Sequence, residues 1–413
     1  MNNGGRKHCR LQIEEQRHNR QEQGSKPEST KETDSRSEHC YHKYEDVFHS
    51  TKIIFFVCRF FLFFEVLMNA KNNAQLQYIN KLRERQASFQ SDELVKGILA
   101  HDRLALASAL TLLESNRGEH MQVMDEVIEK ILPFTGNSLR IGITGVPGVG
   151  KSTFIEALAR EVFQNEENKL AVLSIDPSSP ISKGSILGDK TRMNELSLHP
   201  NAYVRPSPSS SHLGGVNRST RESILLCEAA GYNIVLVETV GVGQSETAVH
   251  AMTDFFLLLM LAGAGDQLQG IKRGIMELTD AMVITKADSG NELKAERARG
   301  EYTSALHLFP QRENNWMPQV FTTSSLEAKG IDVVWNEIEK FHRWSISNGW
   351  IEENRKRQLV NSFEEQIHQV LLHQLQSKPH FKEKYESTLN RVISKELSAH
   401  RAAESFIALF FTA

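Results

Sequence analysis

The feature that most constrains this chain is a glycine-rich loop between a short apolar run and a stretch with helical spacing. Residues 139–158 read LRIGITGVPGVGKSTFIEAL and contain the pattern G-x-x-x-x-G-K-[ST] in that setting. Glycines allow successive backbone N–H groups to point at phosphate oxygens, and the N-terminus of the following helix adds partial positive charge. The stretch therefore predicts a strand, a phosphate-binding loop and a helix.

This loop offers main-chain and side-chain ligands for a nucleotide. We expect Lys151 to reach the β- and γ-phosphates and the Ser152 hydroxyl to bind Mg²⁺. The predicted phosphate-binding residues are Gly145, Val146, Pro147, Gly148, Val149, Gly150, Lys151, Ser152 and Thr153.

Two further apolar runs, 170–175 and 233–237, are each followed by an acid, Asp176 and Glu238. Strands that alternate with helices predict an α/β fold with a mainly parallel sheet, and ligands bind at the carboxyl ends of such strands. Both acids are therefore expected near the metal. Asp189, in the polar loop that follows, is a third candidate, with a simple turn residue as the alternative. The predicted metal ligands are Ser152, Asp176, Asp189 and Glu238.

The second of these acids opens a possible second phosphate motif, acid-x-x-Gly, in which the Gly241 N–H senses the γ-phosphate. Ras-like GTPases place a water-orienting glutamine directly after that glycine, and this chain has Val242 there. Slow intrinsic hydrolysis is expected as a result. Gln244 is a candidate substitute, with a structural role as the alternative. The predicted catalytic residues are Lys151, Glu238 and Gln244.

A later apolar run ends in the tetrapeptide T-K-A-D at residues 285–288, which resembles the base-reading N-K-x-D of GTPases. The Asp288 carboxylate can accept hydrogen bonds from N1–H and the 2-amino group of guanine, and the Lys286 stem can pack over the ring. Thr285 stands in place of asparagine, so one tethering contact is lost or replaced by a hydroxyl. A run that begins at Gln319 ends where a fifth base-contacting loop is expected. The predicted base-site residues are Thr285, Lys286, Asp288, Ser324, Ser325 and Leu326.

Composition excludes some function classes. The 413 residues carry a net charge of −3, so the chain has no general basic surface for nucleic acid. Three of its four cysteines lie before residue 60, so we expect no disulfide framework and a reducing, cytoplasmic location.

The N-terminal part differs from the rest of the chain. Residues 1–52 are polar and are expected to be disordered. The apolar segment 53–67 is shorter than the roughly 20 residues of a spanning helix and contains Arg59 and Glu65, so no stable membrane insertion is expected. We interpret residues 1–67 as an upstream extension of the reading frame and expect translation to start at Met68.

The remaining chain divides into three predicted regions. Residues 68–134 have helical periodicity, residues 135–345 form the nucleotide-binding domain, and residues 346–413 form a C-terminal helical arm. Within the domain, the run FFLLLML at 255–261 predicts a buried central strand. The arm is expected to make a subunit contact, with packing inside one chain as the alternative.

Together the motifs GVPGVGKST, DPSSP, ILGDKTRM, VETVGVGQSE, GAGDQLQGIKRGIMEL and TKAD resemble the MeaB/ArgK family. The resemblance covers about residue 94 to the C-terminus and implies a P-loop NTPase fold of the SIMIBI type. It also implies a homodimeric GTPase that binds GTP or GDP with Mg²⁺. Its nucleotide state is expected to gate adenosylcobalamin delivery to methylmalonyl-CoA mutase, or to a related B12-dependent acyl-CoA mutase, and to protect that enzyme. Loops 241–246 and 263–274 are expected to be the switches that report the nucleotide state to the mutase. Two residues depart from the family pattern, since Ala262 stands where the family usually has proline and Gln267 where it usually has an acid.

Three alternatives stay open at this point. A metallochaperone GTPase requires Cys or His ligand clusters near the nucleotide domain, whereas Cys227 stands alone in a helical pattern. A transport-associated ATPase or kinase requires adenine preference, against which the T-K-A-D stretch argues. A nucleotide-gated scaffold without hydrolysis requires the loss of the catalytic groups, whereas Lys151 and the acids are present.

Overall fold

The computed structural model describes residues 90–115, 117–175, 193–207, 213–239, 245–263 and 273–411. The chain divides into two compact units, Met1–Ser88 and Phe89–Ala413, and all described residues belong to the second. The expectations for residues 1–67 and for a start at Met68 therefore lie outside the described residues.

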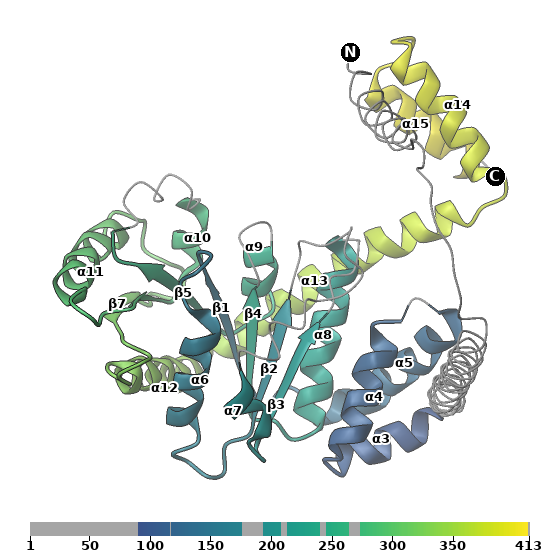
Figure 1. The fold of residues 1–413 in the computed structure, drawn as a ribbon. Coiled ribbons are helices and arrows are strands. Elements are labelled where there is room, and N and C mark those ends of the chain that lie inside the picture. The colour runs from purple at the N-terminus through teal and green to yellow at the C-terminus, as the bar shows by residue number, and fades with distance from the viewer. Residues whose placement is uncertain are drawn as a thin grey trace, which may run out of the picture. The chain divides into compact units, whose positions relative to one another are not determined.

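A seven-stranded sheet with the order β3-β2-β4-β1-β5-β6-β7 forms the centre of the second unit (Figure 1). Every neighbouring pair of strands is parallel. The predicted α/β fold with a parallel sheet is confirmed. The strands are β1 (Leu139–Gly145), β2 (Leu170–Ile175), β3 (Ala202–Ser207), β4 (Ile234–Thr239), β5 (Phe255–Leu261), β6 (Ala281–Thr285) and β7 (Gln319–Thr322).

Strand β3 was not predicted from the sequence. It contains Pro206, which removes a backbone donor and argues against a strand inside a sheet. The structure places β3 at the edge of the sheet, paired with β2 alone, where a proline is tolerated.

Helices cover both faces of the sheet (Figure 1). One face packs against α6 and α12, and the other against α8, with α3, α4 and α5 beyond it. The helical elements before α9 are α3 (Ser91–Leu99), α4 (Arg103–Leu113), α5 (Gly118–Ile131), the 3₁₀ turn η1 (Leu132–Phe134), α6 (Lys151–Val162), α7 (Asn194–Leu198) and α8 (Leu213–Ala229). The later ones are α9 (Ser245–His250), α10 (Arg273–Leu278), α11 (Glu292–Leu306), α12 (Ile331–Ser347), α13 (Trp350–Gln376), α14 (Phe381–Ile393) and α15 (Ala399–Phe411).

The run at 255–261 is a buried strand inside the sheet, as predicted. Strand β5 lies between β1 and β6, and all but its last residue is buried. Among the described residues, no helix is both long enough and apolar enough to cross a membrane. The apolar segment 53–67 is not among them.

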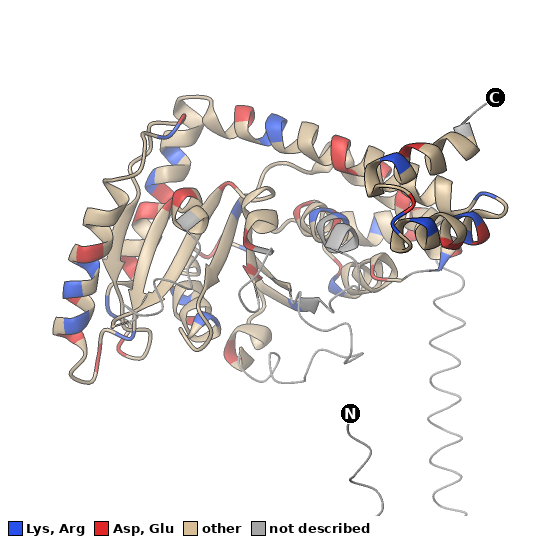
Figure 2. Cartoon of the chain, turned by 90° about the horizontal axis from the view of Figure 1, so that it is seen from above, with Lys and Arg blue, Asp and Glu red and all other residues tan. Residues whose placement is uncertain are grey.

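Charged side chains lie mainly on the helices and loops, while the strands are almost free of them (Figure 2). Acidic and basic residues alternate along α11, which reads ELKAERARGEYTSAL. Such mixing gives no extended basic stripe of the kind that binds nucleic acid.

The first turns of α13 are fastened to the amino-terminal edge of the sheet by Arg355. Its guanidinium donates to both carboxylate oxygens of Asp254, at 2.8 and 2.6 Å, and to the carbonyl oxygens of Gly136 and Ser138. Asp254 also accepts the Arg140 backbone N–H at 2.9 Å. These residues precede or begin β1 and β5. The Arg355 side chain therefore holds α13, the first long helix of the C-terminal arm, to the start of two central strands.

A second buried ion pair holds the same segment to α8. Arg140 donates to both oxygens of Glu228 on α8, at 2.7 and 3.0 Å. The same carboxylate accepts from the Ser138 hydroxyl and the Gly136 N–H. Burial alone raises the pKa of Glu228, but Arg140 and these other donors outweigh burial and lower that pKa below its usual value. The carboxylate is therefore held in its charged form.

Replacing Arg355 is expected to destabilise the protein strongly. Arg355→Met leaves the carboxylate of Asp254 buried, at 2 % side-chain exposure, without its guanidinium partner. Breaking a buried ion pair in this way costs about 3–5 kcal/mol. Urea unfolding followed by circular dichroism measures the change. Arg297→Met, which breaks the exposed Arg297–Glu301 pair on α11, is the control and should change stability by less than about 1 kcal/mol. Equal effects of the two variants would contradict this prediction.

Candidate nucleotide-binding site

The predicted phosphate loop joins β1 directly to α6 at the carboxyl edge of the sheet. Gly148 and Gly150 have φ angles of +76° and +89°, in the left-handed region that favours glycine. A Cβ atom at Gly145 would lie 2.5 Å from the carbonyl oxygen of Leu259 on β5. The three glycines thus allow a tight turn and a close approach of two strands, which other residues would obstruct.

Two buried valine side chains and the Lys151 ammonium hold the rest of the loop in place. Val146 and Val149 are buried at 7 % and 1 % exposure, so their side chains anchor the loop in the core. The Lys151 ammonium donates to the Gly145 carbonyl oxygen at 2.8 Å and so spans the loop. Ser152 follows in the first turn of α6, whose N-terminus supplies backbone N–H groups.

The predicted base-reading loop is tied to the phosphate loop at two points. The Thr285 hydroxyl is within 2.8 Å of the Val149 carbonyl oxygen and 3.2 Å of the Met260 carbonyl oxygen. The Lys286 ammonium donates to the Gly148 carbonyl oxygen at 2.8 Å. The sequence alone does not decide whether the contact of the usual asparagine is lost or replaced by a hydroxyl, and the structure shows the hydroxyl contact.

Asp288 is positioned by the loop after β7. The Ser324 hydroxyl donates to Asp288 Oδ2 at 2.5 Å, and the Ala287 N–H donates to the Thr323 carbonyl oxygen at 2.9 Å. Asp288 and Ser324 are 9 % and 0 % exposed. Ser325 follows Ser324 in the same loop, and Leu326 is largely exposed. A carboxylate held in this way is an acceptor of fixed direction for N–H donors of a base.

Glu238 lies at the end of β4, beside the end of β1. Its register partners are Ile143 on β1 and Ser174 on β2, and residues in register point to the same face of a parallel sheet. Ile143 packs in the hydrophobic cluster that contains α6, so Glu238 lies on the α6 face. The Ser174 hydroxyl donates to Glu238 Oε2 at 3.3 Å.

The predicted metal site is only partly within the described residues. Asp176, Asp189, Gly241 and Gln244 all lie outside them. Ser152 and Glu238 supply hydroxyl and carboxylate oxygens, the donors that Mg²⁺ prefers. Within the described ranges, no group of three or more His, Cys, Asp or Glu side chains could hold a metal by itself. The oxygen donors present therefore fit a Mg²⁺ that is shared with a nucleotide.

Three hydroxyl residues at this edge of the sheet were not predicted from the sequence. Ser174 contacts Glu238, and Thr144 on β1 contacts Thr239 on β4 through their hydroxyl oxygens, 2.8 Å apart. Their only signal in the sequence is a polar residue at the end of an apolar run.

Cys227 is unsuited to bind a metal. It is fully buried on α8, and burial raises the pKa of its thiol. A thiol must lose its proton to bind a metal, so this residue gives no support for a metallochaperone site.

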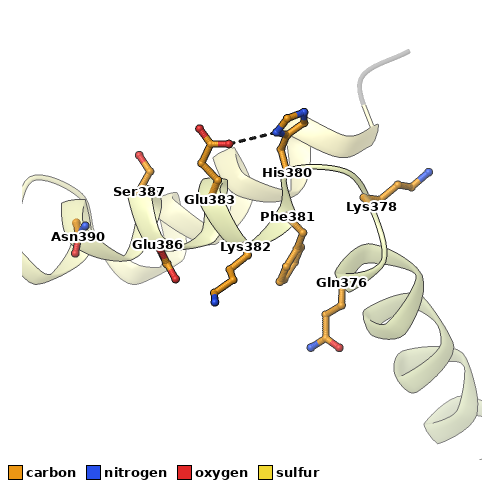
Figure 3. A pocket seen from close by; sticks show the side chains of 9 residues that line it. All are labelled: Gln376, Lys378, His380, Phe381, Lys382, Glu383, Glu386, Ser387 and Asn390. Atoms are coloured by element: carbon orange, nitrogen blue, oxygen red, sulfur yellow. Dashed lines mark hydrogen bonds and ion pairs between the residues drawn. The ribbon is translucent and has the colours of Figure 1, made fainter. Parts of the chain in front are cut away.

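Two cavities lie away from the predicted site residues. A groove of about 900 Å³ follows the bend between α13 and α14, where His380 Nδ1 lies 3.2 Å from Glu383 Oε2 (Figure 3). A second cavity of about 570 Å³ lies between α10, the end of α11 and the segment before β7. No predicted nucleotide-site residue lines either cavity.

A parallel sheet with a glycine loop at β1, a helix on that loop and a tethered T-K-A-D loop defines a P-loop nucleoside triphosphate-binding protein. The family model described as "Methylmalonyl Co-A mutase-associated GTPase MeaB" matches residues 106–380. The chain belongs to this family of GTPases, as its motifs suggested.

Relatives agree with this assignment. The chain is 45 % identical over 306 residues to "GTPase ArgK" of Escherichia coli (strain K12), which covers 74 % of this chain and 92 % of that protein. It is 40 % identical over 329 residues to "Methylmalonic aciduria type A homolog, mitochondrial" of Mus musculus, which covers 77 % of this chain and 79 % of that protein. A solved structure described as "Crystal structure of LAO/AO transport system kinase" is 37 % identical to this chain, with a TM-score of 0.63. The match covers 78 % of this chain and 98 % of the chain in that structure.

The Thr285 tether is expected to contribute to nucleotide affinity. Thr285→Val keeps the shape of the side chain but removes the hydroxyl near Val149 and Met260. One lost hydrogen bond is worth about 1 kcal/mol, so the Kd for GDP should rise about fivefold. Isothermal titration calorimetry measures this change.

Thr303→Val is the matched control for that titration. Thr303 is on α11, and its hydroxyl donates to the Arg299 carbonyl oxygen at 2.7 Å. We expect this variant to bind GDP as the wild type does. A Thr285→Val variant with unchanged affinity would show that the tether has no part in binding.

Proposed function

We propose that this protein is a GTP-hydrolysing chaperone of methylmalonyl-CoA mutase or of a related B12-dependent acyl-CoA mutase. In this proposal its nucleotide state gates the loading of adenosylcobalamin and protects the loaded enzyme. The observation that carries the proposal is the contact of the Thr285 hydroxyl with the Val149 carbonyl oxygen, which joins the T-K-A-D loop to the phosphate loop in a chain of the MeaB family. That family is described as associated with methylmalonyl-CoA mutase, and relatives are named after methylmalonic aciduria.

The base and the phosphates of GTP have separate ligands in this proposal. Asp288, held by Ser324, accepts hydrogen bonds from guanine N1–H and the 2-amino group, which adenine lacks. Backbone N–H groups of residues 145–153, except Pro147, surround the phosphates. Lys151 exchanges its contact with the Gly145 carbonyl oxygen for an oxygen of the β- or γ-phosphate.

Hydrolysis also requires charge neutralisation and an oriented water. Ser152 and Glu238 would hold Mg²⁺, with Asp176 and Asp189 as the further proposed acids. When bound, Mg²⁺ neutralises charge on the phosphates. We assign the orientation of water to Gln244 because Val242 has no polar atom for that role. Hydrolysis by the isolated protein is slow for the same reason.

The proposed switches are loops 241–246 and 263–274, which follow β4 and β5. Each loop leads into a short helix, α9 or α10, and these two helices pack against each other. A change in one loop can therefore reach the other through this contact. We propose that the pair of loops reports the nucleotide state to the mutase.

Hydrolysis measured with and without the mutase tests this function. We expect the full chain to hydrolyse GTP slowly and ATP not at all, because Asp288 finds no matching donors on adenine. Addition of methylmalonyl-CoA mutase from the same organism should raise kcat for GTP at least about tenfold, as partner proteins do for other slow GTPases. Phosphate release is the measurement.

Asp288→Asn provides the control for base recognition. An amide in place of the carboxylate offers a donor to the 2-oxo group of xanthine, so the variant should prefer XTP to GTP. Equal use of ATP and GTP by the wild type would contradict the base assignment. GTP turnover that does not respond to the mutase would contradict the chaperone assignment alone.

We also propose that the C-terminal arm forms a homodimer. From Leu359 onward, α13 exposes large apolar side chains within this chain, and Gln358 is its one buried residue. Their exposed fractions are Leu359 71 %, Val360 49 %, Phe363 67 %, Ile367 41 %, Val370 51 %, Leu371 47 % and Leu372 54 %. Exposed apolar surface of this kind typically marks an interface, and a second copy is the proposed partner.

Charge placed on this surface is expected to separate the subunits. Phe363→Glu introduces a carboxylate into the proposed interface, where burial of an unpaired charge is costly. Light scattering after size-exclusion chromatography should show a dimer for the wild type and a monomer for the variant. Asn361→Glu adds the same charge two residues earlier, on another side of the helix, and should remain dimeric. A dimeric Phe363→Glu variant would place the interface elsewhere.

A further inference from the structure

The backbone ladder between β1 and β4 ends at the pair Ile143 and Glu238. The next residues on the two strands are Thr144 and Thr239. Their hydroxyl oxygens are 2.8 Å apart, so that one hydroxyl donates to the other. Both residues are almost completely buried, at 1 % and 0 % exposure. A side-chain hydrogen bond thus continues the strand pairing one residue beyond the backbone ladder.

The position of this hydroxyl pair relates it to the nucleotide site. Thr144 directly precedes Gly145, the first residue of the phosphate loop, and Thr239 directly follows Glu238. Side chains alternate along a strand, so Glu238 lies on the α6 face while Thr239 lies on the opposite face with Val237. The hydroxyl pair therefore joins the two strand ends on the face of the sheet opposite α6 and Glu238.

On its own face of the sheet, Glu238 contacts the Ser174 hydroxyl. Its contact with the Ser174 hydroxyl is 3.3 Å long, beyond the usual 2.7–2.8 Å of an O–H···O hydrogen bond. The carboxylate is carried by the backbone at the end of β4, so a shift of that strand end also shifts Glu238. The Thr144–Thr239 contact is shorter and fully shielded from water.

We propose that Thr144 and Thr239 are positioning residues for hydrolysis. Their hydrogen bond fixes the strand end that carries Glu238 relative to the phosphate loop, and in this way it sets kcat without contributing to nucleotide affinity. The inference rests on the proposed GTPase function. The alternative is that the pair is only a satisfied polar contact in the core, which would affect stability and nothing else.

Isosteric substitutions separate these two roles. Thr144→Val or Thr239→Val alone leaves one buried hydroxyl without its partner and should lower the melting temperature. The double Val variant removes both hydroxyls and keeps the shape, a change that is often nearly neutral for stability. Thr239→Ser keeps a hydroxyl at the same position and serves as the conservative variant.

The experiment measures kcat, KM, GDP affinity and melting temperature for the full chain and each variant. We expect the double variant to melt near the wild-type temperature and to bind GDP within about twofold, but to lose at least about tenfold in kcat, since small displacements of a positioned group cost up to roughly 10²-fold in rate. Thr239→Ser should keep most of the activity.

Thr279→Val is the control for a buried hydroxyl elsewhere. Thr279 is 0 % exposed and donates to the Ile275 carbonyl oxygen at 2.9 Å, before the start of β6. Its loss should lower stability and leave kcat unchanged. A double Val variant with wild-type kcat would overturn the inference while the GTPase function stands. Failure of the wild type to hydrolyse GTP would overturn both.

Discussion

The contact on which the proposed nucleotide site depends is the one between the Thr285 hydroxyl and the Val149 carbonyl oxygen. It joins the phosphate loop to the base-reading loop although 136 residues separate them in the sequence. Lys286 adds a second contact to the same loop, and Ser324 fixes the carboxylate of Asp288 from the other side. The phosphate loop and the T-K-A-D loop are consequently one connected unit, so that in the proposed site the ligands for phosphate and base already lie at a defined spacing.

At the amino-terminal edge of the sheet, two buried ion pairs hold the strands to the neighbouring helices. The pairs Arg140–Glu228 and Arg355–Asp254 are both two-point contacts between a guanidinium and a carboxylate that is 2 % exposed. Burying such charges has a large desolvation cost, which only good geometry and further hydrogen bonds offset. Here those further bonds go to the segment 136–138 that leads into β1. The arm helix and the sheet are therefore joined by interactions that tolerate little displacement.

Local patterns in the sequence were sufficient for most of the sheet and for the phosphate loop. Apolar runs, glycine spacing and the acids after strands are local signals, and they predicted six of the seven strands. Strand β3 was not predicted because Pro206 is compatible with a strand only at the edge of a sheet. Whether a strand lies at an edge is a property of the assembled sheet and not of the local sequence. The contacts of Thr144, Thr239 and Arg355 were not predicted for a related reason. Their partners are about 95 to 219 residues away, and alone they look like an ordinary strand residue or a surface charge.

The two edges of the sheet carry different tasks, and β1 and β5 are the strands that link them. At the amino edge both strands are held by the Arg355 and Asp254 contacts that position α13. At the carboxyl edge β1 continues into the phosphate loop, and the Leu259 carbonyl of β5 lies so close to Gly145 that no side chain fits between them. These strands are buried in a close-packed core, which transmits strain rather than absorbing it. The Arg355 contacts at the amino edge and the phosphate loop at the carboxyl edge are thus joined by two adjacent strands.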